Sequence, residues 1–244
     1  MATSQGPSFH YHANAFAFSG EFHRPVQRSI EVQAGCSLPH PGGHGQASAE
    51  NFSLDHMVRF TKGYSHVSGS KAGKGYHTSH ATAVLENLNI LDMVTADRVV
   101  ARLASDHDPS KREGHIIAVG TRFENLRVAG CPVQVEMDHD LLIKSKTHAE
   151  LSKNVARLKK SGRIADESNG VVVCSLAKSI QIECPGVEVD GHVITVLQFG
   201  KLYVAELVCS HATRLISMMR LELGSPHDAT LIAASPSING TPFP

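Results

Sequence analysis

The stretch His80-Ala-Thr-Ala-Val-Leu-Glu-Asn-Leu-Asn-Ile90, followed by Asp92-Met-Val-Thr-Ala-Asp-Arg-Val-Val-Ala-Arg-Leu103, decides the fold class. Both runs are rich in β-branched and aliphatic residues on either side of a turn, which is typical of paired β-strands. A second, shorter copy runs from Glu124 to Val135. Each copy closes on Asp-His-Asp, at Asp106-His107-Asp108 and at Asp138-His139-Asp140. The duplication predicts β-structure and indicates no particular reaction.

Toward the N-terminus, the same alternation of apolar and polar residues predicts further strands. Phe9 to Phe22 alternates over its length and carries apolar groups on both faces near its end, and Val26 to Ala34 forms a second short strand. Ala49 to Phe60 alternates as a single strand would. Between these runs, residues 36–45 are expected to form a loop, and residues 62–77 a flexible basic loop rich in Gly and Ser.

Toward the C-terminus, the pattern predicts hairpins. Residues 186–196 form one around Asp190-Gly191, since Asp-Gly favours the tight turns that connect antiparallel strands. Residues 201–208 and 214–223 form another. A short final strand covers residues 229–234, and an extended tail with three prolines follows.

The convincing helix begins at Thr147, where Thr147 and Glu150 have the spacing of a capping box. Leu151, Val155 and Leu158 then form one apolar stripe. About a dozen strands with one capping helix near 147–161 predict an all-β fold, an antiparallel sandwich or a barrel-like architecture. Residues 1–244 are expected to form a single domain, with a division into 1–145 and 163–244, joined by the helix, as the alternative.

Composition excludes several classes of partner. The chain has 23 basic residues (Lys and Arg) and 23 acidic residues (Asp and Glu). This balance argues against nucleic acid binding through a basic surface. No run of apolar residues is long enough to span a bilayer, so no membrane insertion is expected. The N-terminal residues carry neither a basic nor an apolar region of a signal peptide, which predicts a cytoplasmic protein.

The five cysteines are an odd number and include no CxxC pair or zinc-finger spacing. They therefore indicate neither a disulfide framework nor a structural zinc site. Four of them lie in apolar, strand-like runs. We expect buried free thiols at those positions.

The runs Ala83 to Ala104 and Phe123 to Val133 carry a unit of leucine, a small turn, Thr-Ala-Asp and valine, followed by a glycine-turn hairpin. In this, residues from about 80 to 210 resemble the choice-of-anchor P family of bacterial surface proteins. The resemblance implies a non-catalytic β-rich module and a surface or extracellular location. The chain departs from that family in showing no signal peptide and in ending on Phe243-Pro244 rather than on a sorting tail.

The chemical candidates are the 16 histidines. His10 and His12 would project to one face of a strand and could bind a divalent transition metal if a third ligand converges, with His107 or His139 as that ligand. The competing interpretation is solvated or hydrogen-bonded imidazoles in loops, since no established metal motif or nucleophile elbow is present. This second interpretation is favoured and implies no cofactor.

The sequence therefore favours a histidine-rich, non-enzymatic structural or interaction module. It would bind itself or another protein, with homo-oligomers or filaments forming by self-assembly through its terminal strands. The alternative is a His-based, metal-dependent hydrolase or isomerase of unknown substrate. Sequence indicates neither a catalytic residue nor a small-molecule ligand.

Overall fold

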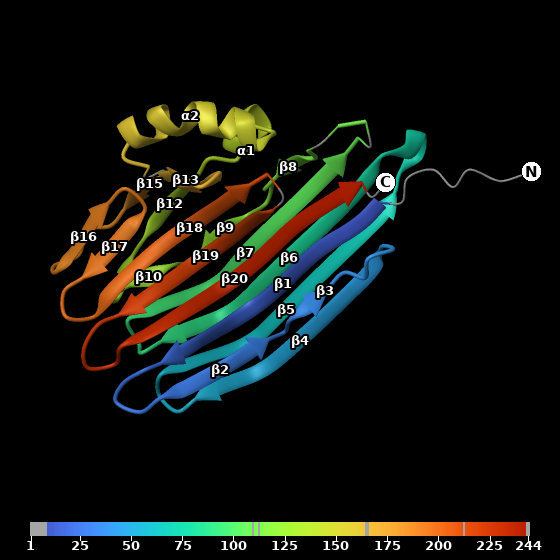
Figure 1. Ribbon diagram of the computed structural model, residues 1–244. Helices are drawn as coiled ribbons and strands as arrows, with labels where there is room; N and C mark the ends of the chain where they lie inside the picture. Colours follow the sequence, from blue (N-terminus) through green and yellow to red (C-terminus); the bar gives the residue numbers. More distant parts are fainter. Residues whose placement is uncertain (1–8, 109, 112, 164–165, 212, 243–244) are drawn as a thin grey trace, which may run out of the picture.

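The structure, a computed structural model, describes residues 9–108, 110–111, 113–163, 166–211 and 213–242. It confirms the all-β prediction. Two large antiparallel sheets face each other as a sandwich and are not closed into a barrel, and two helices lie along one margin (Figure 1). No helix in these described ranges is long and apolar enough to cross a membrane.

Ten strands form the first sheet, sheet A: β1 (Phe9–Phe22), β2 (Arg28–Gln33), β3 (Cys36–Ser37), β13 (Asp166–Ser168), β14 (Val171–Ser175), β16 (Val187–Asp190), β17 (Val193–Val196), β18 (Gly200–Ser210), β19 (Arg214–Leu223) and β20 (Ala229–Pro242). The main path runs β13-β14-β18-β19-β20-β1-β2. β1 and β20 pair along their whole length, from Phe9 opposite Pro242 to Phe22 opposite Ala229. The first and last described strands therefore lie side by side inside the sheet (Figure 1).

Eight strands form sheet B: β4 (Gly43–Leu54), β5 (Val58–Lys71), β6 (His77–Ile90), β7 (Val94–His107), β8 (His115–Ile117), β9 (Arg122–Glu124), β10 (Arg127–Val128) and β11 (Cys131–Pro132). Its path is β11-β10-β7-β6-β5-β4, so four consecutive long strands form a simple meander that ends on β4. The remaining elements are a small third sheet, a short 3₁₀ turn and two helices: β12 (Gln134–Met137), β15 (Ala177–Gln181), η1 (Gly73–Gly75), α1 (Asp140–Lys144) and α2 (His148–Lys160).

The core lies between sheets A and B, where β1 packs across β5 and β6, and β20 across β6 and β7. Its side chains are mainly aliphatic, with a few phenylalanines. The largest fully buried ones include Phe18, Phe22, Leu85, Leu103 and Leu202. Burying each such side chain stabilises the fold by about 1.5–3 kcal/mol.

The long strands of sheet B are interrupted at one level. Successive strands place five polar residues opposite one another there, and the three asparagines among them have φ near +50°. The row consists of Asn51, Thr61, Asn87, Asp97 and Asn125. We call it the asparagine row. Asparagine adopts this left-handed conformation more readily than most residues, which explains its choice.

Sheet A carries a matching interruption, the alanine row. Its three alanines with φ near +50° alternate with residues in extended conformation, as in sheet B. The row consists of Ala34, Ala17, Ala234, Met218 and Ala205. At both rows the strands exchange their faces, so that Ala17 and Phe18 of β1 are both fully buried. This exchange explains why the β1 sequence carries apolar residues on both faces.

Several boundaries differ from the prediction. The single strand expected over residues 49–60 is wrong, because a turn at Asp55, with φ +49°, divides it into β4 and β5. The flexible loop expected over residues 62–77 is also wrong, since most of it is β5. Its glycines allow close approach: a Cβ on Gly63 would lie 2.9 Å from the Ala17 Cβ, and one on Gly69 2.7 Å from the Tyr11 ring.

Two further segments are more ordered than expected. The loop predicted over residues 36–45 contains β3 and the start of β4. The final strand does not stop at residue 234, because β20 continues to Pro242 against β1. The pairing of Pro236 with Ala15 shows that the prolines of this tail fit into the ladder.

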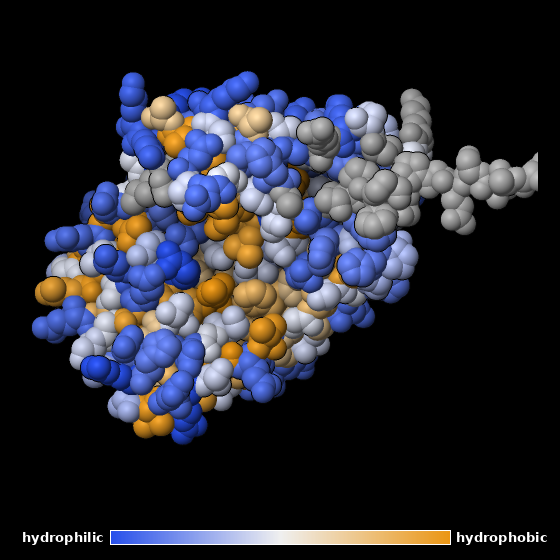
Figure 2. Space-filling model, viewed as in Figure 1, coloured by the Kyte–Doolittle hydropathy of each residue, from blue (hydrophilic) through white to orange (hydrophobic). Residues whose placement is uncertain are grey.

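The predicted helix is confirmed as α2, with the Glu150 amide donating to the Thr147 hydroxyl and Glu150 accepting from the Thr147 amide. Its apolar stripe packs toward β13 and β14. Hydrophilic side chains cover most of the outer surface of this region, at the top of Figure 2. The single-helix prediction missed α1, which begins at Asp140, the last residue of the second Asp-His-Asp copy. A division of the chain at residues 147–161 stays a prediction.

Candidate functional site

β4 forms a free edge of sheet B over 12 residues. One side of β4 pairs with β5, from Gly43 opposite Gly69 to Leu54 opposite Val58. From the other side of residues 43–53, no backbone hydrogen bond reaches another residue that the structure describes. Every side chain of β4 is exposed or half-buried. The strand therefore presents a row of backbone N–H and C=O groups to its surroundings, which is what a strand-addition site requires.

The outer face of sheet B carries charges of alternating sign next to the asparagine row. The strand registers align one residue from each of five strands: Glu50, Lys62, Glu86, Arg98 and Glu124. Lys62 lies 3.8 Å from Glu50, and Arg98 lies 3.7 Å from Glu86. Opposite charges directly across a strand pair stabilise it by about 0.2–1 kcal/mol each. The row begins at the free edge with Glu50, beside which no further strand lies among the residues that the structure describes.

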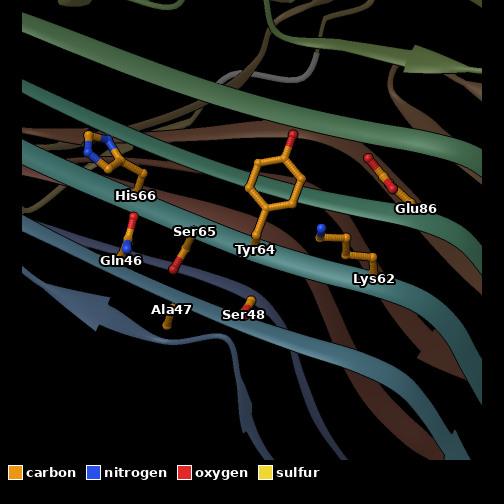
Figure 3. A pocket seen from close by; sticks show the side chains of 8 residues that line it. All are labelled: Gln46, Ala47, Ser48, Lys62, Tyr64, Ser65, His66 and Glu86. Carbon is orange, nitrogen blue, oxygen red and sulfur yellow. The ribbon is translucent and has the colours of Figure 1, made fainter.

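An open polar depression of about 690 Å³ lies on the same face. Lys62, Tyr64 and His66 project into it from one side of β5 (Figure 3). Gln46 and Ser48 of the edge strand line it as well. The Tyr64 hydroxyl accepts a 2.7 Å hydrogen bond from Arg98, which fixes the ring between the charge row and the depression. The depression thus borders the free edge and supplies it with hydrogen-bonding side chains.

The histidine pair His10 and His12 lies on β1, and the fold brings a third imidazole to it. The ring of His40 lies 5.8 Å from that of His10 and 5.5 Å from that of His12, measured between ring centroids. His40 is placed there by the backbone bond from the Tyr11 amide to the His40 carbonyl. In the described ranges, no three side chains of His, Cys, Asp or Glu are positioned as they stand to hold a metal ion.

His107 and His139 lie away from that group. His107 is buried at the end of β7, with its ring 4.9 Å from Phe9, and burial lowers its pKa. Phe9 also stacks on His77, whose Nδ1 lies 2.7 Å from the Tyr11 hydroxyl. His139 precedes α1, and its Nδ1 lies 3.3 Å from the Ala118 carbonyl. The two copies of Asp-His-Asp therefore occupy unlike environments and do not converge.

A buried ion pair lies in sheet A. Arg220 donates two hydrogen bonds to the Glu206 carboxylate, at 2.6 and 2.9 Å, and its guanidinium lies 3.7 Å above the Tyr203 ring. His192 lies 3.4 Å from the same carboxylate. Burial alone would raise the pKa of Glu206, but His192 and Arg220 lower it from 4.5 to about 2. We assign this ion pair to the stability of sheet A, because Arg220 joins β19 to Glu206 of β18.

Glu113 joins three segments that are distant in the sequence. Its carboxylate accepts from the His148 amide at 2.8 Å and from His211 Nδ1 at 2.8 Å, and Arg214 lies 3.4 Å away. Burial alone would raise the pKa of Glu113, but these hydrogen bonds and the Arg214 charge lower it. Sequence reasoning missed Glu113 because an isolated glutamate in a loop gives no signal of its distant partners. The carboxylate fixes the start of α2 against the β18–β19 turn.

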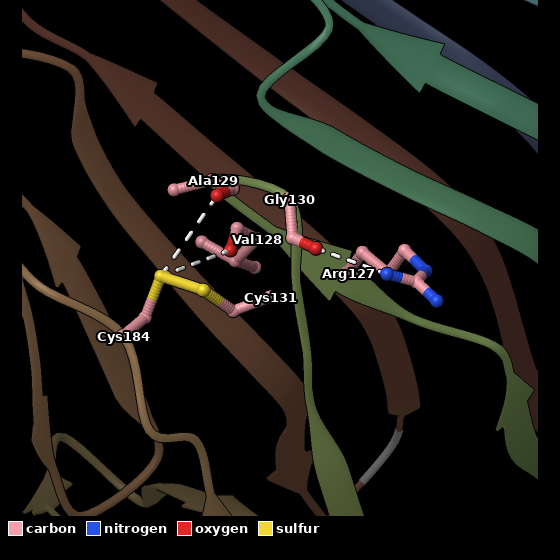
Figure 4. Close-up of a disulfide and its surroundings, with 6 residues drawn as sticks. All are labelled: Arg127, Val128, Ala129, Gly130, Cys131 and Cys184. Atoms are coloured by element: carbon pink, nitrogen blue, oxygen red, sulfur yellow. Dashed lines mark hydrogen bonds between the residues drawn. A yellow bond between two sulfur atoms is a disulfide. The ribbon is translucent and has the colours of Figure 1, made fainter.

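The expectation of buried free thiols, made for four of the five cysteines, is wrong for two of those four. Cys131 of β11 and Cys184, which follows β15, form a disulfide with a Cα–Cα distance of 5.9 Å (Figure 4). They are separated by 53 positions in the sequence, so spacing gave no signal of their pairing. Cys174 and Cys209 are buried free thiols as expected, and burial raises their pKa values to about 12 and about 11. Cys36 is a half-buried free thiol.

Comparison with known proteins identifies a family but not an activity. Two overlapping segments, residues 9–164 and 154–210, match the family described as "Domain of unknown function (DUF8256)". No curated protein and no solved structure matches the chain. No comparison bears on the resemblance to the choice-of-anchor P family, which stays a prediction. Because the matched segments cover more than half of the chain, this protein belongs to the DUF8256 family.

Proposed function

We propose that this protein is a non-enzymatic interaction module that accepts an extended strand, from its own copy or from another protein, beside β4. The observation that carries this proposal is the free 12-residue edge of sheet B. A strand added there would bond to backbone groups that have no backbone partner among the described residues. The terminal strands, which were expected to serve this role, pair with each other inside sheet A. Of the described strands that end a sheet, β4 is the longest, so we place the added strand beside it.

The composition of β4 supports strand addition. Residues 43–49 are glycine, alanine, serine, histidine and glutamine, without the lysine or proline that often protects an exposed edge. Most of these side chains are small, so they leave room for a neighbouring strand about 4.8 Å away. The depression on the outer face adds Gln46, Tyr64 and His66 as hydrogen-bonding groups for side chains of the added strand.

Amide hydrogen exchange tests the proposal. The probe is a synthetic, end-blocked peptide of residues 43–54, because strand addition depends mainly on the backbone. We expect the β4 amides that point away from β5 to become protected when the peptide is added, or to be protected already if two copies pair. Exchange of these amides at the rate of an open loop, at all protein and peptide concentrations, would show that the edge accepts no strand.

Two proline variants provide a matched control for that experiment. Ala47→Pro and Ser48→Pro each remove one N–H, and in an antiparallel ladder neighbouring residues point their N–H groups in opposite directions. One variant therefore weakens the β4–β5 ladder, and the other alters only the free edge. We expect the variant that keeps the wild-type melting temperature to lose the protection. Full protection in that variant would contradict the proposal.

We also propose that the module works in an oxidising compartment. The Cys131–Cys184 disulfide supports this, because such bonds persist mainly outside the cytoplasm. The loop that it closes corresponds to a stabilisation of about 4 kcal/mol in the chain-entropy account. Thiol counting by mass spectrometry on protein isolated under alkylation should find three free thiols and one disulfide. Five alkylated cysteines in protein taken directly from its cell would contradict the compartment and favour the cytoplasm.

A second candidate function is the binding of a divalent transition metal by His10, His12 and His40. The proximity of the His40 ring to the pair favours it, and two of the three side chains are exposed and can rotate. Tetrahedral zinc would bring the rings slightly closer together than they are here. Titration with zinc should give one site that His40→Ala abolishes and His44→Ala leaves intact. Equal zinc binding by wild type and His40→Ala would eliminate this site.

A further inference from the structure

The free edge of β4 is self-complementary in charge and in side-chain size. On its outer face lie His44, Gln46, Ser48 and Glu50, in that order. On its inner face lie Gly45, Ala47 and Ala49, which are small. A basic group thus stands at one end of the regular segment and an acidic group at the other. An antiparallel copy of the same segment would bring each group opposite its counterpart.

Geometry restricts how two copies can pair. In an antiparallel ladder, the side chains of two directly opposite residues lie on the same face of the sheet. The two residues either both direct their backbone N–H and C=O groups at each other or both direct them away. The twofold axis must therefore pass through a residue of β4, not between two residues. Gly43, with φ +112°, and Asn51, with φ +52°, lie on either side of the regular segment, so the ladder is confined to residues 44–50. Within these limits, the axis through Ala47 places His44 opposite Glu50 of the second copy, Gln46 opposite Ser48, and Gly45 opposite Ala49.

Other registers are less favourable. An axis through Gln46 leaves Glu50 without a basic partner. An axis through Ser48 places His44 opposite Phe52. An axis through His44 or through Glu50 places that residue opposite its own copy, so that two groups of the same kind face each other. The register through Ala47 also extends the charge row of sheet B. His44 of the second copy would follow Glu50, Lys62, Glu86 and Arg98 in strict alternation of sign.

We propose that the partner of β4 is a second copy of this chain, paired antiparallel about Ala47 so that His44 of each copy faces Glu50 of the other. This rests on the proposed strand addition at β4 and names its partner. The two sheets B then form one continuous sheet across the dimer. The polar depressions beside the two edge strands, each lined by Gln46 and Ser48, meet across the twofold axis and form one longer trough.

A charge-exchange experiment tests the partner and the register together. The dimer dissociation constant is measured by sedimentation equilibrium at about pH 5.5, below the ordinary pKa of an imidazole and above that of a carboxyl group, for wild type, His44→Glu, Glu50→Lys and the double variant. Each single variant removes two opposite-charge contacts per dimer and introduces two contacts between groups of like sign, so we expect dimerisation to weaken about tenfold or more. The double variant restores two opposite-charge contacts and should return to within about threefold of wild type.

Restoration is diagnostic because residues 44 and 50 lie far apart in one copy, roughly 20 Å along an extended strand. Glu188→Lys on the exposed face of β16 makes the same charge change at a distance from the edge and should leave dimerisation unchanged. As a second measurement, Ala47→Cys should form a disulfide-linked dimer on mild oxidation, and Glu188→Cys should not. All four substituted positions are exposed or half-buried, so the variants should fold.

Two results would overturn the inference. A wild-type protein that stays monomeric at millimolar concentration excludes the second copy, while peptide-induced protection of β4 would still uphold strand addition by another partner. A dimer whose stability is unaffected by the single variants, or is not restored in the double variant, excludes this register. Loss of both self-association and peptide binding would instead refute the proposed function itself.

Discussion

The two sheets carry the same backbone interruption with different residues. Sheet B uses Asn51, Asn87 and Asn125, and sheet A uses alanine at three positions, all with φ near +50°. The asparagines are exposed or half-buried, whereas Ala205 and Ala234 are fully buried. Burial thus decides which residue can occupy the same conformation.

An exposed asparagine can bond its neighbours in the row. The Asn87 amide donates to the Thr61 hydroxyl at 2.9 Å, and the Asn125 amide donates to the Asp97 carboxylate at 2.6 Å. A buried asparagine would place an amide in the core without a partner, which costs about 1–3 kcal/mol. Alanine avoids that cost but accepts the steric strain of a left-handed backbone, about 1–2 kcal/mol. The same left-handed backbone conformation is therefore occupied by asparagine where the position is exposed and by alanine where it is buried.

The largest expected effect comes from enlarging the alanine row. Ala234→Val adds two methyl groups at a fully buried position and places a β-branched side chain in the left-handed region. We expect the free energy of unfolding to fall by about 3 kcal/mol or more, measured by urea denaturation. Asn51→Val, at an exposed position of the other row, should cost less. Equal losses at the two positions would show that burial does not distinguish the rows.

Acid should weaken sheet A before sheet B. The folded pKa of Glu206, about 2, lies below the unfolded pKa of 4.5, so its stabilisation is complete above pH 4.5 and is lost as the pH falls toward 2. The shift corresponds to about 3 kcal/mol. Glu206→Gln should therefore be less stable than wild type at pH 7, and the difference should shrink at pH 3. The half-exposed Glu86–Arg98 pair of sheet B should contribute no more than about 1 kcal/mol at any pH.

A constant difference between wild type and Glu206→Gln from pH 7 to pH 3 would contradict this assignment. Glu86→Gln is the control, because it changes the same functional group in the exposed charge row. Thermal unfolding monitored by circular dichroism at each pH gives both comparisons. We expect the difference in melting temperature between Glu86→Gln and wild type to stay nearly constant from pH 7 to pH 3.

Exchanging residue types between the rows should sharpen the comparison further. Ala205→Asn buries an amide within sheet A and should destabilise by about 2 kcal/mol. Ala205→Gly removes the strain without adding a polar group and should stay close to wild type, within about 1 kcal/mol. Urea denaturation measures both. If Ala205→Asn were as stable as Ala205→Gly, polarity at this position would not explain the choice of alanine.

The smallest effect is expected at Asn87. Asn87→Ala loses the hydrogen bond to Thr61 and a residue suited to positive φ, at a cost of about 1 kcal/mol. Asn87→Gly loses the bond but suits the backbone, and should lie between the alanine variant and wild type. A glycine variant less stable than the alanine variant would show that the backbone conformation is not the controlling factor.

Local signals in the sequence predicted much of the fold. Alternation gave the limits of β1, and the capping box gave the start of α2. The pair Asp190-Gly191 indicated the β16–β17 hairpin, whose two turn residues are Gly191 and His192 because Asp190 pairs with Val193. Each depends on residues within a few positions of one another. The asparagine and alanine rows, in contrast, become visible only when strand registers align residues from different strands.

What could not be predicted depends on distant partners. The glycines of β5 resemble a loop until β1 is placed against them, and Cys131 resembles a free thiol until the fold brings Cys184 to it. Within the candidate site, the sequence did not indicate a role for Glu50 or Tyr64. An edge strand can be recognised only when the order of the strands in the sheet is known. The histidine pair was identified from the sequence, but its neighbour His40 was not.

The pairing of β1 with β20 sets the order in which the chain can become a sandwich during synthesis. Strands β4 to β7 follow one another and can form their meander as they leave the ribosome. β1 is made earlier but must wait for residues 229–242, the last strand described. Until β20 is made, β1 lacks the strand with which it pairs along its whole length. During that time the apolar side chains of residues 9–22 can be buried only against the completed meander of sheet B.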